Sequence, residues 1–241
     1  MIKLFANGCV LILTGMLVFI SSCKKDTPAT AIDLGYAYFP DQAGKYVIYD
    51  VDSIVYDDFQ HDTDIYKFLI KEKTESIYTD NSGRPTLRIE RYKKTYDPNK
   101  SYDSIPWKLK DVWCANLTGS SAEKVEENIR YVKLIFPIEK NKTWNGNSFN
   151  ILSEWEYKYT DINMPKAYGV LNFDSTLLVM QKNYQDLIQK HYYTEVYAKN
   201  VGMIYKEVFD VHSGTINSLP VENRIESGLH MKMQVIAYGT E

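Results

Sequence analysis

Apolar and polar residues alternate along much of the chain, which is the pattern of strands. The alternation is clearest over 151–159, where Trp155, Tyr157 and Tyr159 share one face, and over 229–237. A period of two residues is typical of a sheet with one covered and one wetter face. Similar segments between turn-rich clusters predict further strands, which span residues 45–56, 64–78, 86–96, 105–114, 130–136, 167–172, 175–183, 187–198 and 203–212.

This succession of strands predicts an all-β protein with little helix. We expect a single antiparallel, strongly curved sheet or half-barrel, with a closed barrel or a β-sandwich as the alternatives. One weak helical signal exists at Ser120-Ser-Ala-Glu123, which fits a capping box. The residues that follow have too few apolar positions to bury a helical face, so we expect a polar loop there with at most a turn or two of helix.

The hairpin around Lys199-Asn-Val-Gly202 can be tested for register. If Gly202 takes the left-handed position of a four-residue loop, opposite charges and apolar side chains face each other across the strands. The predicted pairs are Ala198–Met203, Glu195–Lys206, His191–Asp210, Val196–Tyr205 and Tyr192–Phe209. We expect the charged pairs on a solvated face, and we interpret His191–Asp210 as a polar cross-strand contact rather than a catalytic pair.

The first 22 residues have the layout of a secretory signal. They contain one charge, Lys3, then an apolar run and the small pair Ser21-Ser22. The run is shorter than the roughly 20 apolar residues that span a bilayer, so we expect it to be cleaved.

The residues around the predicted cleavage point resemble a lipobox. The segment Ile20-Ser-Ser-Cys23-Lys-Lys-Asp26 is similar to that of bacterial lipoproteins, in a form common in Bacteroidota. The resemblance implies that the Cys23 thiol carries a diacylglycerol and its amino group an acyl chain such as palmitate. The expected organisation is a signal peptide over 1–22, a lipidated tether over 23–34 and one β domain over 35–241. An ordinary secretory signal is the alternative.

Three further segments resemble uncharacterised Bacteroidota lipoproteins of about this length. They begin at Tyr38-Phe39-Pro40, at Phe136-Pro137 and at Glu195, the last being the Tyr-Ala-Lys-Asn-Val-Gly hairpin. The resemblance implies an envelope protein anchored to the outer membrane by lipid, with its side of that membrane left open. It implies no activity. The strand order also resembles the curved sheets of lipoprotein carriers, which is an analogy of fold.

Composition limits which classes of partner and which cysteine chemistry are expected. The net charge of −3 gives no basic excess, so nucleic-acid binding is not expected. Tyrosine contributes 20 of 241 residues, which favours sheet. Beyond Cys23 the chain has one cysteine, Cys114, so no intrachain disulfide is expected. We interpret Cys114 as a small core residue rather than a nucleophile.

No catalytic, metal or cofactor motif stands out. The histidines, His61, His191, His212 and His230, are widely spaced. The acidic residues Asp57, Asp58, Asp62 and Asp64 lack the glycine and glutamate of a calcium loop, and we expect a solvated loop. Ser53, Ser104 and Ser175 each follow an aspartate and resemble Bacteroidota O-glycosylation sites.

These observations favour a non-enzymatic envelope lipoprotein that binds an apolar or amphipathic ligand, or a protein partner, through its curved sheet. The faces expected to line the concave side carry Trp155, Tyr157 and Tyr159 in one strand and Tyr192 and Val196 in another. Three alternatives remain open: an ordinary packed core, an accessory subunit of an outer-membrane complex, and a hydrolase with an unrecognised site.

Overall fold

The computed structural model describes residues 32–59 and 62–241. The predicted signal peptide, Cys23 and His61 therefore lie outside the described residues. Asp33–Glu241 form one compact unit. Among the described residues, no helix has both the length and the apolar character needed to cross a membrane.

Twelve strands of this unit form one sheet, and each strand pairs antiparallel with its neighbours. Their bounds are β1 Lys45–Asp57, β2 Asp62–Thr79, β3 Pro85–Thr95, β4 Lys108–Leu117, β5 Ser121–Glu126, β6 Ile129–Ile135, β7 Thr143–Asn145, β8 Glu156–Tyr168, β9 Leu171–Gln185, β10 Gln189–Ala198, β11 Gly202–His212 and β12 Ser227–Thr240. Short 3₁₀ turns lie at Tyr36–Tyr38 (η2), Tyr102–Ser104 (η3) and Val221–Asn223 (η4). The predicted all-β class is confirmed.

The sheet curls until its two edges meet. The strand order runs from β6 through β1 and β12 to β7, so the edge strands are neighbours in sequence. Val132 N donates to Gly146 O at 2.9 Å, and Trp144 Nε1 donates to Val132 O at 2.9 Å. These bonds occupy edge groups that would otherwise be unpaired. The result is a single curved antiparallel sheet that is nearly closed into a barrel.

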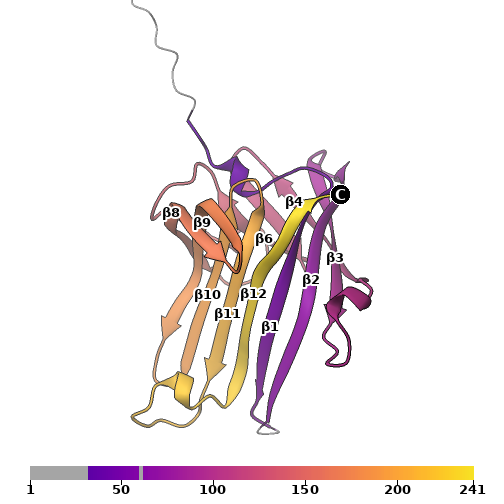
Figure 1. The fold of residues 1–241 in the computed structure, drawn as a ribbon. Helices are drawn as coiled ribbons and strands as arrows, with labels where there is room; N and C mark the ends of the chain where they lie inside the picture. Colours follow the sequence, from indigo (N-terminus) through magenta and orange to yellow (C-terminus); the bar gives the residue numbers. More distant parts are fainter. Residues whose placement is uncertain (1–31, 60–61) are drawn as a thin grey trace, which may run out of the picture. The chain divides into compact units, whose positions relative to one another are not determined.

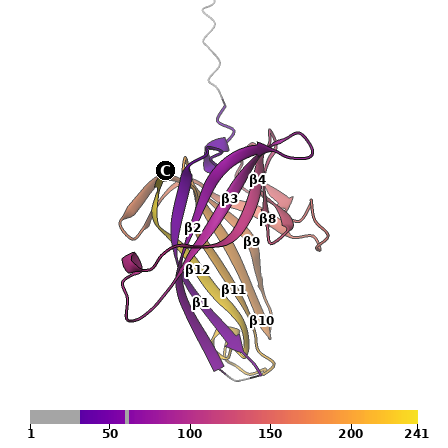
Figure 2. The ribbon, with the colours of Figure 1, turned by 90° about the vertical axis from the view of Figure 1, so that its right-hand side faces the viewer.

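The two ends of this barrel differ. We call the end where β1 begins and the chain ends the upper end, and the end with the β1–β2 turn the lower end (Figure 1). Figures 1 and 2 show β1, β2, β10, β11 and β12 reaching further toward the lower end than β4 and β6. Among the described strands, β4 and β6 therefore do not extend opposite the long strands at the lower end.

An aromatic core fills the upper half. It contains Tyr38 and Phe39 beside η2, Phe136 and Trp144 near the sheet edges, and Tyr159 of β8. The Trp144 and Tyr159 ring centroids lie 4.4 Å apart. Because Tyr159 both donates to and accepts from the Ile135 backbone, its hydroxyl is satisfied inside this core.

The β8–β9 hairpin folds over the outer face of the sheet. Tyr168 stacks on Tyr205 with centroids 5.2 Å apart, and Phe173 meets Tyr238 at 5.7 Å. Val196 is consequently 2% exposed although it lies on the outer face. Of the two aromatic faces expected on the concave side, the one with Tyr192 and Val196 therefore points outward.

The strands begin and end at residues that differ from several of the sequence predictions. Ser121–Glu126 form strand β5 instead of a polar loop, because they pair with β4 on one side and β6 on the other. Residues 151–155 are not a strand, and Ile151 is fully exposed. The strand predicted over 167–172 straddles the β8–β9 turn, where Gly169 has a φ of 57°.

The predicted hairpin register is confirmed over most of its length. Glu195 pairs with Lys206, His191 with Asp210, Val196 with Tyr205, and Tyr192 with Phe209. A bulge between Val196 and Tyr197 shifts the last pairs, so Ala198 lies opposite Gly202 and not Met203.

Candidate functional site

Charged residues cross the middle of the barrel interior. In β10 the inward positions are Tyr193, Glu195 and Tyr197, and the register places Glu195 beside Lys206 of β11. Lys133 of β6 reaches across the interior to the same carboxylate, with Nζ 2.6 Å from Glu195 Oε1. Glu195 is 0% exposed. The charged face predicted to be solvated is therefore enclosed.

The ion pairs continue from Lys133 into the opposite wall. Its Nζ lies 3.5 Å from Glu126 Oε1, and Lys206 Nζ lies 3.3 Å from Glu195 Oε1 and 3.9 Å from Glu126 Oε2. Lys124 of β5 lies 3.8 Å from Glu126 and 2.8 Å from Glu72 Oε2 of β2. These contacts join strands that are far apart in the sheet order.

The network ends on Arg91 of β3. Its guanidinium contacts Glu72 Oε1 at 2.9 Å and Asp111 Oδ2 at 2.8 Å, and it stacks 3.6 Å from the centre of the Trp113 ring. We call this set the interior ion network; its acids are Glu72, Asp111, Glu126 and Glu195 and its bases are Arg91, Lys124, Lys133 and Lys206. Its buried part pairs four acids with four bases, and the exposed Lys110 also contacts Asp111 at its rim.

Pairing keeps these buried groups ionised. Burial raises the pKa of Glu195, but the ammonium groups of Lys133 and Lys206 outweigh burial and hold that pKa below its ordinary value. The pKa of Glu126 is lowered for the same reason, by Lys133, Lys206 and Lys124. Burial lowers the pKa of Lys133, but Glu126 and Glu195 raise it above its ordinary value. The network is thus a set of mutually neutralised charges.

Cavities lie on both sides of the network. The upper cavity, of about 90 Å³, is lined by apolar side chains that include Phe39, Leu87 and Met203. The lower cavity, of about 250 Å³, is lined by Glu126, Tyr131, Lys133, Trp155, Tyr157, Gln181, Tyr193, Lys206 and Val208. Because Lys133 lines both, the network forms a layer between them.

Aromatic rings form the wall of the lower cavity. The Trp155 ring meets Tyr193 at 5.2 Å and Tyr157 at 5.8 Å between centroids, in edge-to-face geometry. Burial raises the pKa of Tyr157 well above its ordinary value, so its phenol stays neutral. Of the predicted aromatic face, Trp155 and Tyr157 reach the cavity, whereas Tyr159 belongs to the packed upper core.

The predicted His191–Asp210 pair forms on the inner face below this cavity. His191 Nδ1 lies 2.8 Å from Asp210 Oδ1, an ion-pair distance without hydrogen-bond alignment. The other ring nitrogen, Nε2, is 3.0 Å from Gln189 Oε1, and the Tyr193 hydroxyl donates to Asp210. Both imidazole nitrogens therefore face groups other than a nucleophile.

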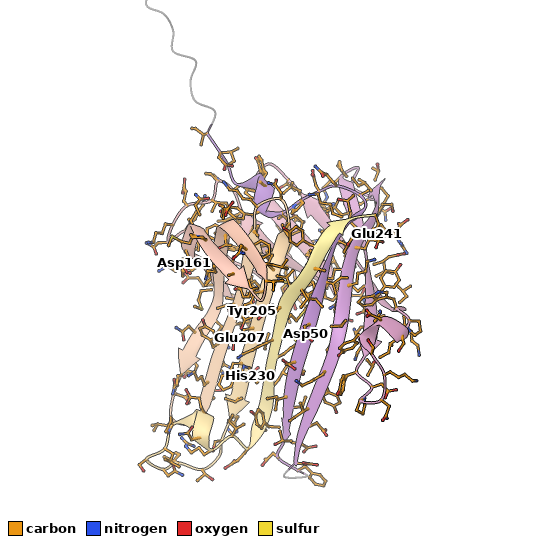
Figure 3. The ribbon with its side chains drawn as sticks, in the orientation of Figure 1. Asp50, Asp161, Tyr205, Glu207, His230 and Glu241 are labelled. Carbon is orange, nitrogen blue, oxygen red and sulfur yellow. The ribbon has the colours of Figure 1, made fainter. Side chains whose placement is uncertain are left out.

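A second histidine contact lies on the outer face. His230 Nε2 is 3.0 Å from Glu207 Oε1, and the Tyr205 hydroxyl donates to Glu207 Oε2 at 3.0 Å (Figure 3). His212 is exposed at the end of β11. In the described part of the chain, no three His, Cys, Asp or Glu side chains are grouped to hold a metal ion, the acidic residues near the β1–β2 turn included.

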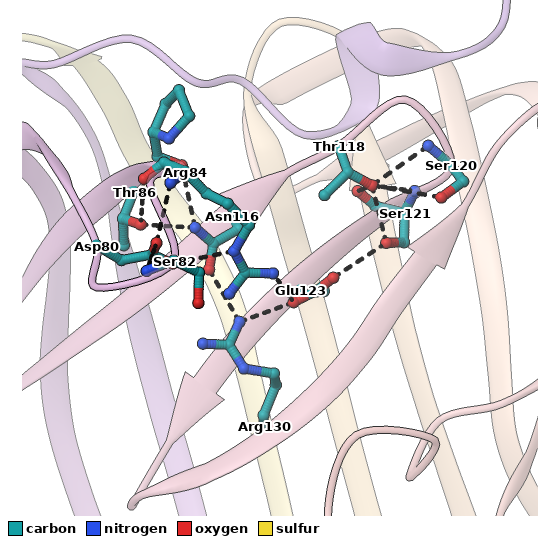
Figure 4. A network of polar contacts seen from close by, with 11 residues as sticks. Asp80, Ser82, Arg84, Thr86, Asn116, Thr118, Ser120, Ser121, Glu123 and Arg130 are labelled. Carbon is teal, nitrogen blue, oxygen red and sulfur yellow. Dashed lines mark hydrogen bonds and ion pairs between the residues drawn. The ribbon is translucent and has the colours of Figure 1, made fainter.

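A separate polar cluster lies near the upper end, on the outside of β5. Glu123 Oε2 is 2.7 Å from Arg130 Nη1 and 3.4 Å from Arg84 Nη1, while Asn116 accepts from Arg130 and donates to Thr86 (Figure 4). These bonds tie the β2–β3 turn to β4, β5 and β6. The capping-box residues thus serve a sheet contact and not a helix.

The remaining predicted residues are scattered. Cys114 is a free, half-buried cysteine outside the core clusters, so its expected core position is wrong. Ser53 is 8% exposed on the inner face, and Ser175 bonds Asn163 and Tyr38. Ser104 is exposed in η3. Of the three serines that resemble O-glycosylation sites, Ser104 is the most accessible.

Sequence reasoning missed the interior ion network, although it left a trace. Lys133 interrupts the otherwise apolar stretch Tyr131-Val-Lys-Leu-Ile135, and Lys124 and Glu126 alternate with Glu123 and Val125. A charge within an apolar strand indicates a buried partner. The identity of that partner depends on which strands meet across the barrel.

No protein-family profile matches the chain, and no curated protein matches it. A solved structure from Bacteroides fragilis NCTC 9343, described as that of an inferred exported protein with a YmcC-like fold, aligns over 84% of this chain and 98% of its own, with 11% identity and a TM-score of 0.41.

Proposed function

We propose that this protein is a lipid-anchored protein of the cell envelope, held at the outer membrane through Cys23, that binds an amphipathic ligand without catalysing a reaction. The anchor and the location rest on the lipobox around Cys23. More than one acyl chain on that residue meets the requirement for stable membrane attachment.

The observation that carries ligand binding is the lower cavity. It is walled by Trp155, Tyr157 and Tyr193, and its lining includes Val208 of the long strand β11. A pocket of about 300 Å³ or more usually encloses a whole small ligand. The cavity of about 250 Å³ is somewhat smaller. It suits one end of an amphipathic molecule whose remainder lies along the inner face of the long strands.

The interior charges support binding over hydrolysis. A catalytic acid or base needs a proton that it can exchange with the reacting group. Here Glu126 and Glu195 are held ionised by lysines, and His191 faces Asp210 and Gln189. These three candidate acid–base groups therefore each face a charged or polar partner within the fold.

Ligand binding can be tested with a fluorescent apolar probe, N-phenyl-1-naphthylamine. The segment Asp33–Glu241 contains the whole sheet and its core, so it is the form to use. We expect saturable fluorescence enhancement, weakened about fivefold by Val208→Gln, which places an amide on the cavity wall.

The matched control is Val170→Gln on the β8–β9 turn, where the side chain is 92% exposed. It should bind the probe like the unaltered protein. Absence of saturable binding, or equal affinity of a folded Val208→Gln variant, would contradict the proposed ligand site. Circular dichroism and melting temperature establish that the variants are folded.

A further inference from the structure

Several hydrogen-bond donors of the lower cavity wall have capacity that the fold does not use. Trp155 Nε1 is buried, and no group of the described residues accepts its proton. Lys206 Nζ stays 3.3 Å from Glu195 and 3.9 Å from Glu126. Charge-assisted bonds usually measure about 2.7–2.9 Å, so this ammonium has hydrogen-bonding capacity left over. Both carboxylates already face Lys133.

Lys182 places a second ammonium beside the same wall. It pairs with Tyr193 across β9 and β10, and its Nζ lies 5.9 Å from the centre of the Trp155 ring. Across the residues the structure describes, no carboxylate comes within ion-pair distance of Lys182. Asp210, the next acid on this face, receives the Tyr193 hydroxyl and lies beside His191.

The charge around the cavity is therefore positive on balance. Among the lining side chains, Lys133 and Lys206 stand against Glu126, and Lys182 adds a third cation 5.9 Å from the centre of the Trp155 ring. Lys182 is not a member of the interior ion network, and its ammonium lies near the Trp155 ring that lines the cavity.

A mostly apolar strip, interrupted by Ser53, leads away from this positive end. The strip crosses four neighbouring strands, starting at Val208 of β11, which lines the cavity. Val208 pairs with Met231 of β12, and Met231 pairs with Ser53 of β1. Ser53 in turn pairs with Tyr66 of β2. Phe68 follows on the same face of β2, and the Tyr66 ring is 50% exposed. The strip runs along the inner face of the long strands at the lower end.

We infer that the lower cavity binds the anionic head group of an amphipathic ligand, between Lys206, Lys182 and the Trp155 indole, with the apolar tail along Val208, Met231 and Tyr66. This inference rests on the proposed function and adds the charge and the orientation of the ligand. The spare capacity of Lys206 and the ammonium of Lys182, which has no carboxylate partner among the described residues, both favour an acceptor-rich head group.

The test compares probes that share one decyl chain. Decyl phosphate, decyl maltoside and decyltrimethylammonium, each below its critical micelle concentration, compete with N-phenyl-1-naphthylamine on the Asp33–Glu241 segment. We expect decyl phosphate to bind about tenfold more tightly than decyl maltoside, and the cationic probe to bind most weakly. Inorganic phosphate alone should compete poorly, because it lacks the tail.

Two lysine variants assign the preference to the cavity. Lys182→Gln should weaken decyl phosphate about fivefold and leave decyl maltoside unchanged. Lys140→Gln, at an exposed lysine outside the cavity, should change neither. Equal affinity for anionic and neutral probes, an unchanged Lys182→Gln variant, or inorganic phosphate binding as tightly as decyl phosphate would overturn the inference. The proposed function would still stand if the naphthylamine probe binds.

Discussion

Glu195 shows how a single residue depends on its partners in this fold. It is fully buried, takes a hydrogen bond from Tyr197 and contacts Lys133 at 2.6 Å. Removing one charged side chain of such a pair leaves the opposite charge buried and unpaired, which destabilises the fold. Replacing both side chains with apolar ones leaves no buried charge. Glu195 therefore matters to stability mainly through what its loss would leave behind.

We predict that Glu195→Leu or Lys133→Met alone lowers the free energy of unfolding by about 3–5 kcal/mol, and that the double variant recovers a large part of the loss. Urea denaturation of Asp33–Glu241 measures this. The exposed pair Lys67–Asp52, 3.2 Å apart, is the control, and Asp52→Asn should cost less than about 1 kcal/mol. A double variant as unstable as the sum of the single ones would contradict this account.

The same pair sets a direction for the pH dependence. A carboxyl whose pKa is lower in the folded protein stabilises the fold above its unfolded pKa, and this contribution is lost as the pH falls. The free energy of unfolding should therefore decrease as the pH falls below about 4.5, the ordinary value for glutamate. Lys133, with its pKa raised, contributes below its ordinary value of 10.5 and adds no loss in this acid range. Glu195→Leu should flatten the acid slope.

At the scale of elements, the approach of β12 to β11 depends on Gly228. Its φ is 131°, and a Cβ placed on it would lie 2.1 Å from the backbone oxygen of Asp210. Backbone cannot yield as a flexible side chain can, so even one methyl group would force the strands apart at the pair Val211–Gly228.

We predict that Gly228→Ala lowers the melting temperature by about 5–10 °C, the effect of about 2–3 kcal/mol in a chain of this size. Gly83→Ala is the matched control, because Gly83 also has a positive φ, of 77°, but nothing lies within 4 Å of its Cβ position. Differential scanning fluorimetry compares the two variants. Equal shifts would show that backbone strain, and not the contact with Asp210, limits position 228.

Element positions were predictable to the extent that they depend on local alternation and turns. The register of the β10–β11 hairpin follows from Gly202 and from the pairing of Glu195 with Lys206. The strand β5 was missed because its inward residues, Lys124 and Glu126, are charged and resemble an exposed segment. Charged inner positions also explain why the candidate site was not found from the pattern.

At the scale of the whole molecule, the predicted anchor can be tested directly. Mass spectrometry of the amino-terminal peptide from the native host should show Cys23 as the first residue, carrying a diacylglycerol and an amide-linked acyl chain. The protein should partition into the detergent phase, and Cys23→Ala should abolish both results. A mature chain that begins elsewhere, or that stays in the aqueous phase, would contradict the anchor.

The sequence by itself determined the all-β class, most strand positions and the β10–β11 register, because alternation and turn chemistry act between near neighbours. It also divided each strand into two faces. Only the tertiary structure decided which face the curvature encloses, because that depends on contacts between distant strands, such as Lys133 of β6 with Glu195 of β10. Charged side chains can occupy the interior when they pair with opposite charges on other strands. Closure of the sheet brings those strands within reach of each other.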